Sequence, residues 1–66
     1  MKIVAEPENL KPRRFIIKQD KAAGFYLLVY ENGHCIRDHL QDTIEQAMSA
    51  AFEMYEVPKE SWQAET

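Results

Sequence analysis

The chain has 66 residues, of which 45% are hydrophobic and one is a cysteine, and its formal net charge is -3. This length suffices for one small domain, and a single cysteine excludes an internal disulfide. The acidic balance argues against functions that need a strongly positive surface, such as non-specific binding of nucleic acid.

Residues 1–12 show no regular pattern, and two prolines interrupt them. We predict an extended N-terminal arm in which Ile3, Val4 or Leu10 docks on the rest of the domain. No apolar run is long enough for a secretion signal or a membrane span. The unpaired thiol fits a reducing compartment, so we expect a cytoplasmic protein that makes no membrane contact.

Three strand-like segments follow the arm, at residues 13–19, 25–31 and 34–40. The connection between the first two has five residues and ends in Gly24, which suits a hairpin loop. Asn32 and Gly33 between the last two predict a two-residue type I′ turn, because both residue types tolerate positive φ. The sequence therefore predicts a three-stranded antiparallel meander with its second segment in the middle.

An amphipathic helix follows the third strand. Asp42 and Glu45 have the spacing of a capping box, so the helix should begin at Asp42 or Thr43. Pro58 should end it one or two residues earlier. The apolar stripe at helical spacing consists of Ile44, Ala47, Met48, Ala51, Phe52 and Tyr55.

The fold class predicted from these elements is α+β. A single β-β-β-α domain spans residues 13–66, with the helix packed on one face of the sheet. The tail after the helix should make one short turn, and Trp62 should fold back to close the open end of the core.

The middle strand carries the main functional clue. Residues 25–30 read Phe-Tyr-Leu-Leu-Val-Tyr, and all six are apolar or aromatic. A strand with one solvated face should alternate between apolar and polar side chains. Both faces of this strand therefore need cover, and the single helix covers only one of them.

The turn lengths predict the register and hence the two faces. A two-residue turn pairs Tyr30 with Cys35, and a five-residue loop pairs Gln19 with Phe25. The face toward the helix should then hold Phe15, Ile17, Phe25, Leu27, Val29, Ile36 and Leu40. Asp38 falls on this apolar face, which a position at the sheet edge or a β-bulge would relieve.

The opposite face is predicted to be an interface. Its apolar centre is rich in tyrosine and is framed by cationic side chains, as is common at protein–protein contacts. The candidate interface residues are Arg14, Ile16, Lys18, Tyr26, Leu28, Tyr30, Arg37 and His39. Cys35 should lie among them as a partly covered apolar filler. A homodimer that stacks two such faces is the simplest form.

Two other interpretations of this face stay open. The tyrosine and leucine side chains could be shielded only by the aliphatic stems of arginine and lysine on a solvated sheet. Alternatively, basic and aromatic side chains on a sheet could bind single-stranded nucleic acid by stacking.

No pattern in the chain predicts catalysis, a cofactor or a metal site. Two glycines do not make a phosphate-binding loop. On the predicted strand, Cys35 and His39 share a face but lie about 13 Å apart, and His34 points the other way. Such a distance excludes a shared zinc ion and a Cys–His nucleophile pair.

The side chains of the predicted helix also have ordinary structural explanations. Glu45, Glu53 and Glu56 are expected as solvated charges, since a catalytic carboxyl group needs a cleft. Met48, Met54 and Phe52 are expected in the core. We therefore expect a protein that is not an enzyme.

Four short motifs carry a family resemblance. They are residues 15–20 (Phe-Ile-Ile-Lys-Gln-Asp), 24–26 (Gly-Phe-Tyr), 33–35 (Gly-His-Cys) and 42–47 (Asp-Thr-Ile-Glu-Gln-Ala). In this order the chain resembles the partial RNase H-like domain of HicB-type antitoxins. The resemblance implies a bacterial β-β-β-α domain and a toxin as the protein partner.

The helix end and the tail, residues 52–62, are similar to those of small uncharacterised bacterial β-β-β-α proteins, some of which resemble immunity proteins of toxin systems. The sequence thus predicts a non-catalytic bacterial protein that acts through protein–protein contact and forms a homodimer. The alternatives are an antitoxin or immunity-type protein that binds a toxin, and a nucleic-acid-binding sheet.

Overall fold

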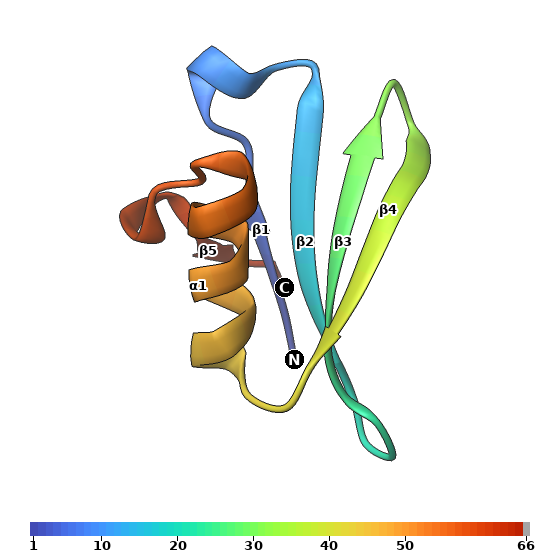
Figure 1. Cartoon of the computed structure of the whole chain (residues 1–66). Coiled ribbons are helices and arrows are strands. Elements are labelled where there is room, and N and C mark those ends of the chain that lie inside the picture. Colours follow the sequence, from blue (N-terminus) through green and yellow to red (C-terminus); the bar gives the residue numbers. More distant parts are fainter. Residues whose placement is uncertain (66) are drawn as a thin grey trace.

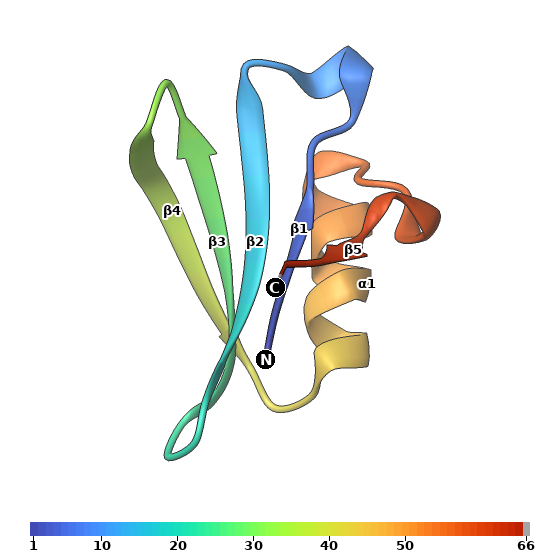
Figure 2. The same ribbon diagram turned by 180° about the vertical axis from the view of Figure 1, so that it is seen from behind.

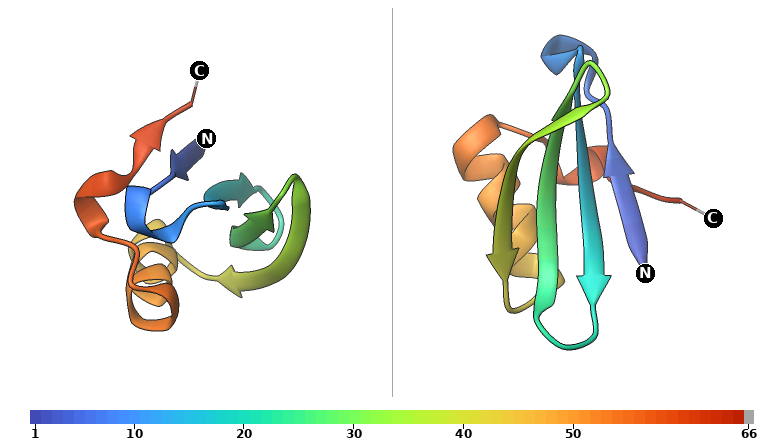
Figure 3. Two further views of the ribbon diagram at one scale, coloured as in Figure 1. Left: turned by 90° about the horizontal axis from the view of Figure 1, so that it is seen from above. Right: turned by 90° about the vertical axis from the view of Figure 1, so that its right-hand side faces the viewer.

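The computed structural model describes residues 1–65, which form an α+β fold with one antiparallel sheet and one α-helix (Figure 1). The elements in chain order are β1 (Lys2–Ala5), η1 (Glu8–Leu10), β2 (Arg13–Asp20), β3 (Gly24–Glu31), β4 (His34–Gln41), α1 (Ile44–Tyr55), η2 (Lys59–Ser61) and β5 (Gln63–Ala64). The order of the five strands in the sheet is β4-β3-β2-β1-β5. The helix lies against one face of the sheet (Figure 3).

The predicted three-stranded meander is confirmed as β2, β3 and β4, but it is only part of the sheet. The predicted N-terminal arm contains β1, which pairs antiparallel with β2 and sets Ile3 opposite Ile17. The tail contributes β5, which pairs with β1 and sets Gln63 opposite Val4. Both ends of the chain therefore lie side by side at one edge of the sheet (Figure 2).

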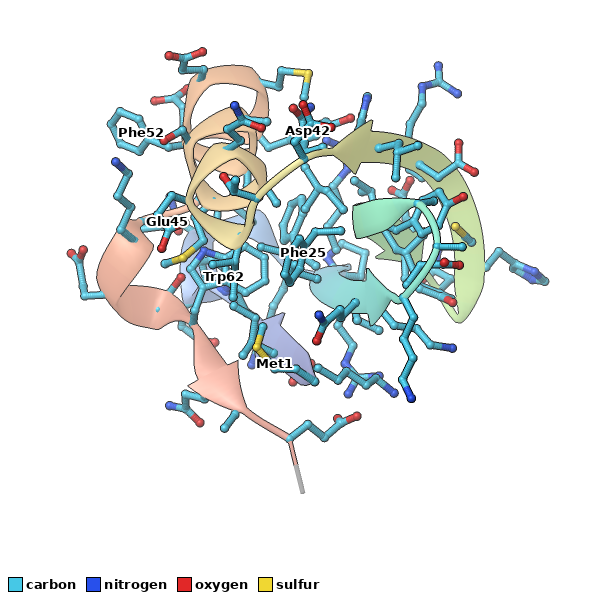
Figure 4. The ribbon with its side chains drawn as sticks, turned by 90° about the horizontal axis from the view of Figure 1, so that it is seen from below. Met1, Phe25, Asp42, Glu45, Phe52 and Trp62 are labelled. Carbon is cyan, nitrogen blue, oxygen red and sulfur yellow. The ribbon has the colours of Figure 1, made fainter. Side chains whose placement is uncertain are left out.

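The core lies between the sheet and α1. Its fully buried members are Ala5, Phe15, Ile17, Leu27, Val29, Ala47, Ala51 and Val57. The two helix alanines lack bulk beyond Cβ, so the helix can approach the sheet closely. Ile3, Leu10 and Trp62 pack against this core, as expected for the docked arm and the returning tail. Figure 4, which looks along the strands from below, shows Trp62 and Phe25 directed into the space between α1 and the sheet, with Phe52 at the periphery.

The cap of α1 differs from the prediction. Thr43, not Asp42, is the N-cap: its hydroxyl accepts from the Gln46 amide at 3.1 Å, and the Gln46 side chain accepts from the Thr43 amide. The capping box was therefore displaced by one residue from the Asp42–Glu45 pair. The helix ends at Tyr55, and the capping residue Glu56, with a positive φ of 61°, turns the chain away before Pro58.

Both predicted hairpins are present. Asn32 (φ 54°) and Gly33 (φ 82°) take the positive φ values that a two-residue type I′ turn requires. Gly24 also has a positive φ, 122°, and a Cβ at this position would lie 2.5 Å from the carbonyl oxygen of Gln41. The β2–β3 register is the predicted one, with Gln19 opposite Phe25.

The β3–β4 register is correct only next to the turn. Tyr30 lies opposite Cys35, but Val29 lies opposite Arg37, so Ile36 is an extra residue in β4. This β-bulge reverses the faces of the rest of β4. Ile36 stays with the core, as expected, whereas Leu40 moves away from it.

Three other side chains are more exposed than predicted. Phe52 is 52% exposed, Met54 is 48% exposed, and Cys35 is exposed rather than partly covered. At 3.6 residues per turn, Phe52 and Met54 each lie about 80° from the centre of the buried helical stripe. The helix contacts the sheet most closely through the two small residues Ala47 and Ala51, and this contact is narrow. The side chains of Phe52 and Met54 beside it therefore face outward.

Candidate functional site

The face of the sheet turned away from α1, here called the open face, is the candidate site. The right-hand view of Figure 3 looks onto this face, with α1 behind the strands. Alternation along the paired strands places these residues on it: Lys2, Val4, Arg14, Ile16, Lys18, Tyr26, Leu28, Tyr30, Cys35, Asp38 and Leu40.

Six of the eight predicted interface residues lie together on this face. They are Arg14, Ile16, Lys18, Tyr26, Leu28 and Tyr30, which face one another in pairs across β2 and β3. Arg37 and His39 do not join them, because the bulge at Ile36 turns both toward the helix side. The prediction was wrong for these two residues, and Asp38 and Leu40 take their place on the open face.

His39 has a structural contact on the helix side. Its Nε2 lies 2.8 Å from the hydroxyl oxygen of Tyr55, and the two ring centroids are 5.9 Å apart. Tyr55 also packs against Phe15 in the core. His39 thus joins β4 to α1 and is not available to a partner on the open face.

The half of the open face over β1 is covered by charged side chains. Arg14 Nη2 lies 2.8 Å from Glu65 Oε2, and Lys2 Nζ lies 2.8 Å from Glu65 Oε1. Arg14 lies on β2 and Glu65 directly follows β5, so their contact spans β1, where the half-buried Val4 lines a hollow together with them. Ile16, next to Val4, is only 5% exposed although no helix lies on this face.

The charges around Glu65 affect its protonation. The hydrogen bond from Lys2, together with the positive charges of Lys2 and Arg14, lowers the pKa of the Glu65 carboxyl group below its usual value, although partial desolvation acts against this. Glu65 therefore stays ionised, and holds both cations, to lower pH than a free glutamate would.

The half of the open face over β3 and β4 has no such cover. Its apolar centre, here called the open patch, consists of Tyr26, Leu28, Tyr30, Cys35 and Leu40. The two tyrosines and Leu28 are partly exposed, and Leu40 is 50% exposed. A hollow of about 340 Å³ lies beside them, lined by Lys18, Gln19, Asp20, Tyr26, Leu28 and Asp38.

Charges of opposite sign border the open patch. Lys18 lies on the β2 side and Asp38 on the β4 side, and neither forms an ion pair within residues 1–65. Arg14, the other cation beside the patch, is paired with Glu65, and its Nε lies 3.8 Å from Glu6 Oε1. The border is therefore mixed in sign and not uniformly basic.

The sequence prediction missed Lys2 and Val4, because it did not place β1 in the sheet, and it missed Asp38 and Leu40 on β4. One sign of the changed register in β4 was present in the sequence, because Asp38 fell on the apolar face of the predicted sheet. A β-bulge removes this misfit. The pattern alone did not show where in β4 the bulge falls.

The hydroxyl of Ser61 and the thiol of Cys35 form local hydrogen bonds, and the possible metal ligands do not cluster within residues 1–65. Ser61 lines a polar hollow beside β5, but its hydroxyl donates to the carbonyl oxygen of Pro58 at 2.6 Å. The Cys35 thiol donates to the carbonyl oxygen of Arg37 at 3.4 Å. Among residues 1–65, no three histidine, cysteine or acidic side chains gather where they could hold a metal ion.

Comparisons of the chain with protein-family models, with curated proteins and with solved structures find no match. Across residues 1–65, α1 is too short and too polar to cross a membrane, and no other helix could do so. The geometry of the open face is therefore the basis for the functional argument.

Proposed function

We propose that this protein acts without catalysis, by binding another protein through the open patch, and that the partner is a second copy of the chain. The observation that carries the proposal is the contrast within the open face. Ion pairs cover the half over β1, while aromatic and aliphatic side chains stand uncovered over β3 and β4. Apolar surface gathered in this way favours association.

The composition of the open patch supports a protein partner. Tyrosine is enriched at interface hot spots because it buries a large ring and keeps a polar hydroxyl at the rim. Tyr26 and Tyr30 flank Leu28 along β3, and Leu40 lies opposite Tyr26 on β4. A partner would desolvate a continuous apolar surface and meet polar groups only around it.

The charge pattern favours a protein partner over nucleic acid. Binding to a phosphate backbone needs several free cations. On the open face, Lys2 and Arg14 are paired with Glu65, Arg14 also lies beside Glu6, and Asp38 adds a negative charge beside the patch. Lys18 is left as the single cation of this face, within the described residues, that is not in an ion pair.

The size of the patch sets the expected affinity. Three strands about 4.8 Å apart and some five residues long give a footprint of about 14 by 17 Å. This is smaller than the roughly 800 Å² per partner of a standard stable interface. We therefore expect weak self-association, with a dissociation constant in the micromolar range or above.

Sedimentation equilibrium over a concentration series tests the proposal. Wild-type protein should shift from monomer to dimer as its concentration rises into the range of hundreds of micromolar. Leu28→Glu should stay monomeric, since it places a charge in the centre of the patch. Phe52→Glu is the control, because Phe52 is also an apolar side chain with exposed surface, 52% exposed, but lies on α1 and not on the open face.

The control should associate as the wild type does. A wild-type protein that stays monomeric throughout the series would overturn the proposal that a second copy is the partner. A dimer that Leu28→Glu leaves intact, or that Phe52→Glu dissociates, would move the interface away from the open patch.

A further inference from the structure

The border charges of the open patch are arranged so that two copies can complement each other. Lys18, the cation of this face that is not in an ion pair within residues 1–65, lies on β2, on one side of β3, and Asp38 lies on β4, on the other side. A surface with opposite charges on its two sides can pair with itself only in particular orientations. The orientation of a dimer can therefore be inferred from the strand positions of these residues.

We infer that two copies stack open face to open face around a two-fold axis that runs along β3, so that β4 of each copy lies over β2 of the other. Asp38 of one copy then faces the stretch of β2 between Arg14 and Lys18 of the second copy. This inference rests on the proposed function and adds the relative orientation of the two copies and the residues that meet.

The other way to stack the two faces is electrostatically worse. A two-fold axis across the strands would place β4 over β4 and β2 over β2. Asp38 would then face Asp38, and Lys18 would lie over Arg14, which is already paired with Glu65, and would therefore be far from Asp38. Like charges facing each other at an interface oppose association, so the pattern selects the axis along the strands.

The shape of the surface favours the same orientation. Leu40 projects from β4 level with Tyr26 and Lys18, and the last two line the hollow of about 340 Å³. With β4 over β2, Leu40 of one copy lies above Lys18 of the other and can enter this hollow. With the axis across the strands, Leu40 would instead face Cys35.

Pairing of two copies through the free edge of β4 is disfavoured. The bulge at Ile36 interrupts the ladder along this edge, and the Arg37 guanidinium donates to the Ile36 carbonyl oxygen at 3.0 Å. The exposed charges of Arg37 and Asp38 also stand next to each other there. Bulges and charges are the usual protection of an edge strand against pairing with another chain.

Charge variants in sedimentation equilibrium distinguish the two stacked orientations. Asp38→Asn removes an attraction in the inferred dimer, so its dissociation constant should rise about tenfold relative to the wild type, given that the contact occurs twice. In the other orientation the same change removes a repulsion and strengthens the dimer. Asp42→Asn is the matched control, since it removes an exposed carboxylate outside the face.

A charge exchange gives the second test. Lys18→Glu and Asp38→Lys should each weaken the dimer, and the double variant should recover most of the wild-type affinity. Folding of each variant is checked by circular dichroism and by its urea midpoint. A double variant that associates no better than the single variants would overturn the inferred pairing.

Cross-linking reports the orientation independently. In a Cys35→Ser background, Tyr30→Cys should cross-link to itself with a short bis-maleimide, because β3 lies on the axis. A cross-link that forms only between Tyr30→Cys and Tyr26→Cys protein would show the other orientation. Absence of any wild-type dimer would overturn the proposed function itself, whereas a dimer that Asp38→Asn strengthens or leaves unchanged overturns only this inference.

Discussion

The two faces of β3 show how one apolar strand can serve two purposes. Leu27 and Val29 point to the helix side and are fully buried, while Tyr26 and Leu28 point to the open face and stay partly exposed. Leu27 and Leu28 are the same residue type, so the difference between these two comes from what lies above them. The helix side thus forms the core of the fold, and the open face is the surface that we propose for a partner.

The largest effect should come from truncating neighbouring leucines on the two faces. Leu27→Ala leaves a cavity under α1 and should lower the free energy of unfolding by about 3 kcal/mol. Leu28→Ala removes a partly solvated side chain and should cost about 1 kcal/mol or less. Urea unfolding at a concentration where the protein is monomeric measures both. Equal losses would mean that the two faces are not distinct.

Gly24, where β3 begins, should give the next largest effect. In Gly24→Ala the new Cβ would meet the Gln41 carbonyl oxygen at 2.5 Å, on backbone with a φ of 122°. We expect a loss of about 2 kcal/mol in the free energy of unfolding. Gly33→Ala is the matched control: its φ is also positive, but nothing lies within 4 Å, so its loss should be smaller. The same urea titration would contradict this account if the order were reversed.

The third prediction tests the side of the sheet to which His39 points. Tyr55→Phe removes the hydroxyl that contacts His39 Nε2 and should cost about 1 kcal/mol. A double-mutant cycle with His39→Ala should show a coupling of about 0.5–1 kcal/mol, because the two groups are in contact. A coupling of zero would place His39 on the open face and remove the bulge from the explanation.

The smallest effect concerns the ion pairs that cover the half of the open face over β1. The pKa of Glu65 is lower in the folded chain than its usual value of 4.5. Its contribution to stability is therefore complete above the unfolded pKa and is lost as the pH falls through the folded pKa. Unfolding midpoints of wild type and Glu65→Gln should converge as the pH falls below 4.5 and then through the lowered pKa of the folded chain, where the wild-type carboxyl group becomes protonated. A difference that grows as the pH falls would contradict the stated sign.

The meander could be predicted because its signals are local. Asn32 and Gly33 specify a tight turn, and the loop that ends in Gly24 fixes the register of β2 and β3. Six of the eight predicted interface residues follow from that register. The α+β class and the helix are equally local, since both follow from the spacing of apolar residues.

The remaining features depend on tertiary contacts. The bulge at Ile36 keeps this side chain on the core and moves Asp38 to solvent, a gain that depends on packing across the sheet. β1 is four residues long and β5 only two, so neither gives a strand pattern of its own. β1 pairs with the edge of β2, and β5 then pairs with the edge of β1. Phe52 was assigned to the core because helical spacing does not show how narrow the alanine contact is.

A dilution series followed by two-dimensional ¹H–¹⁵N NMR tests the central claim most directly, because it reports on each backbone amide. The account predicts that the amides of residues 26–30 and of Leu40 shift with protein concentration, while those of α1 do not. Shifts that centre on the exposed side of α1 around Phe52, or spectra that do not change with concentration, would contradict a dimer formed through the open patch.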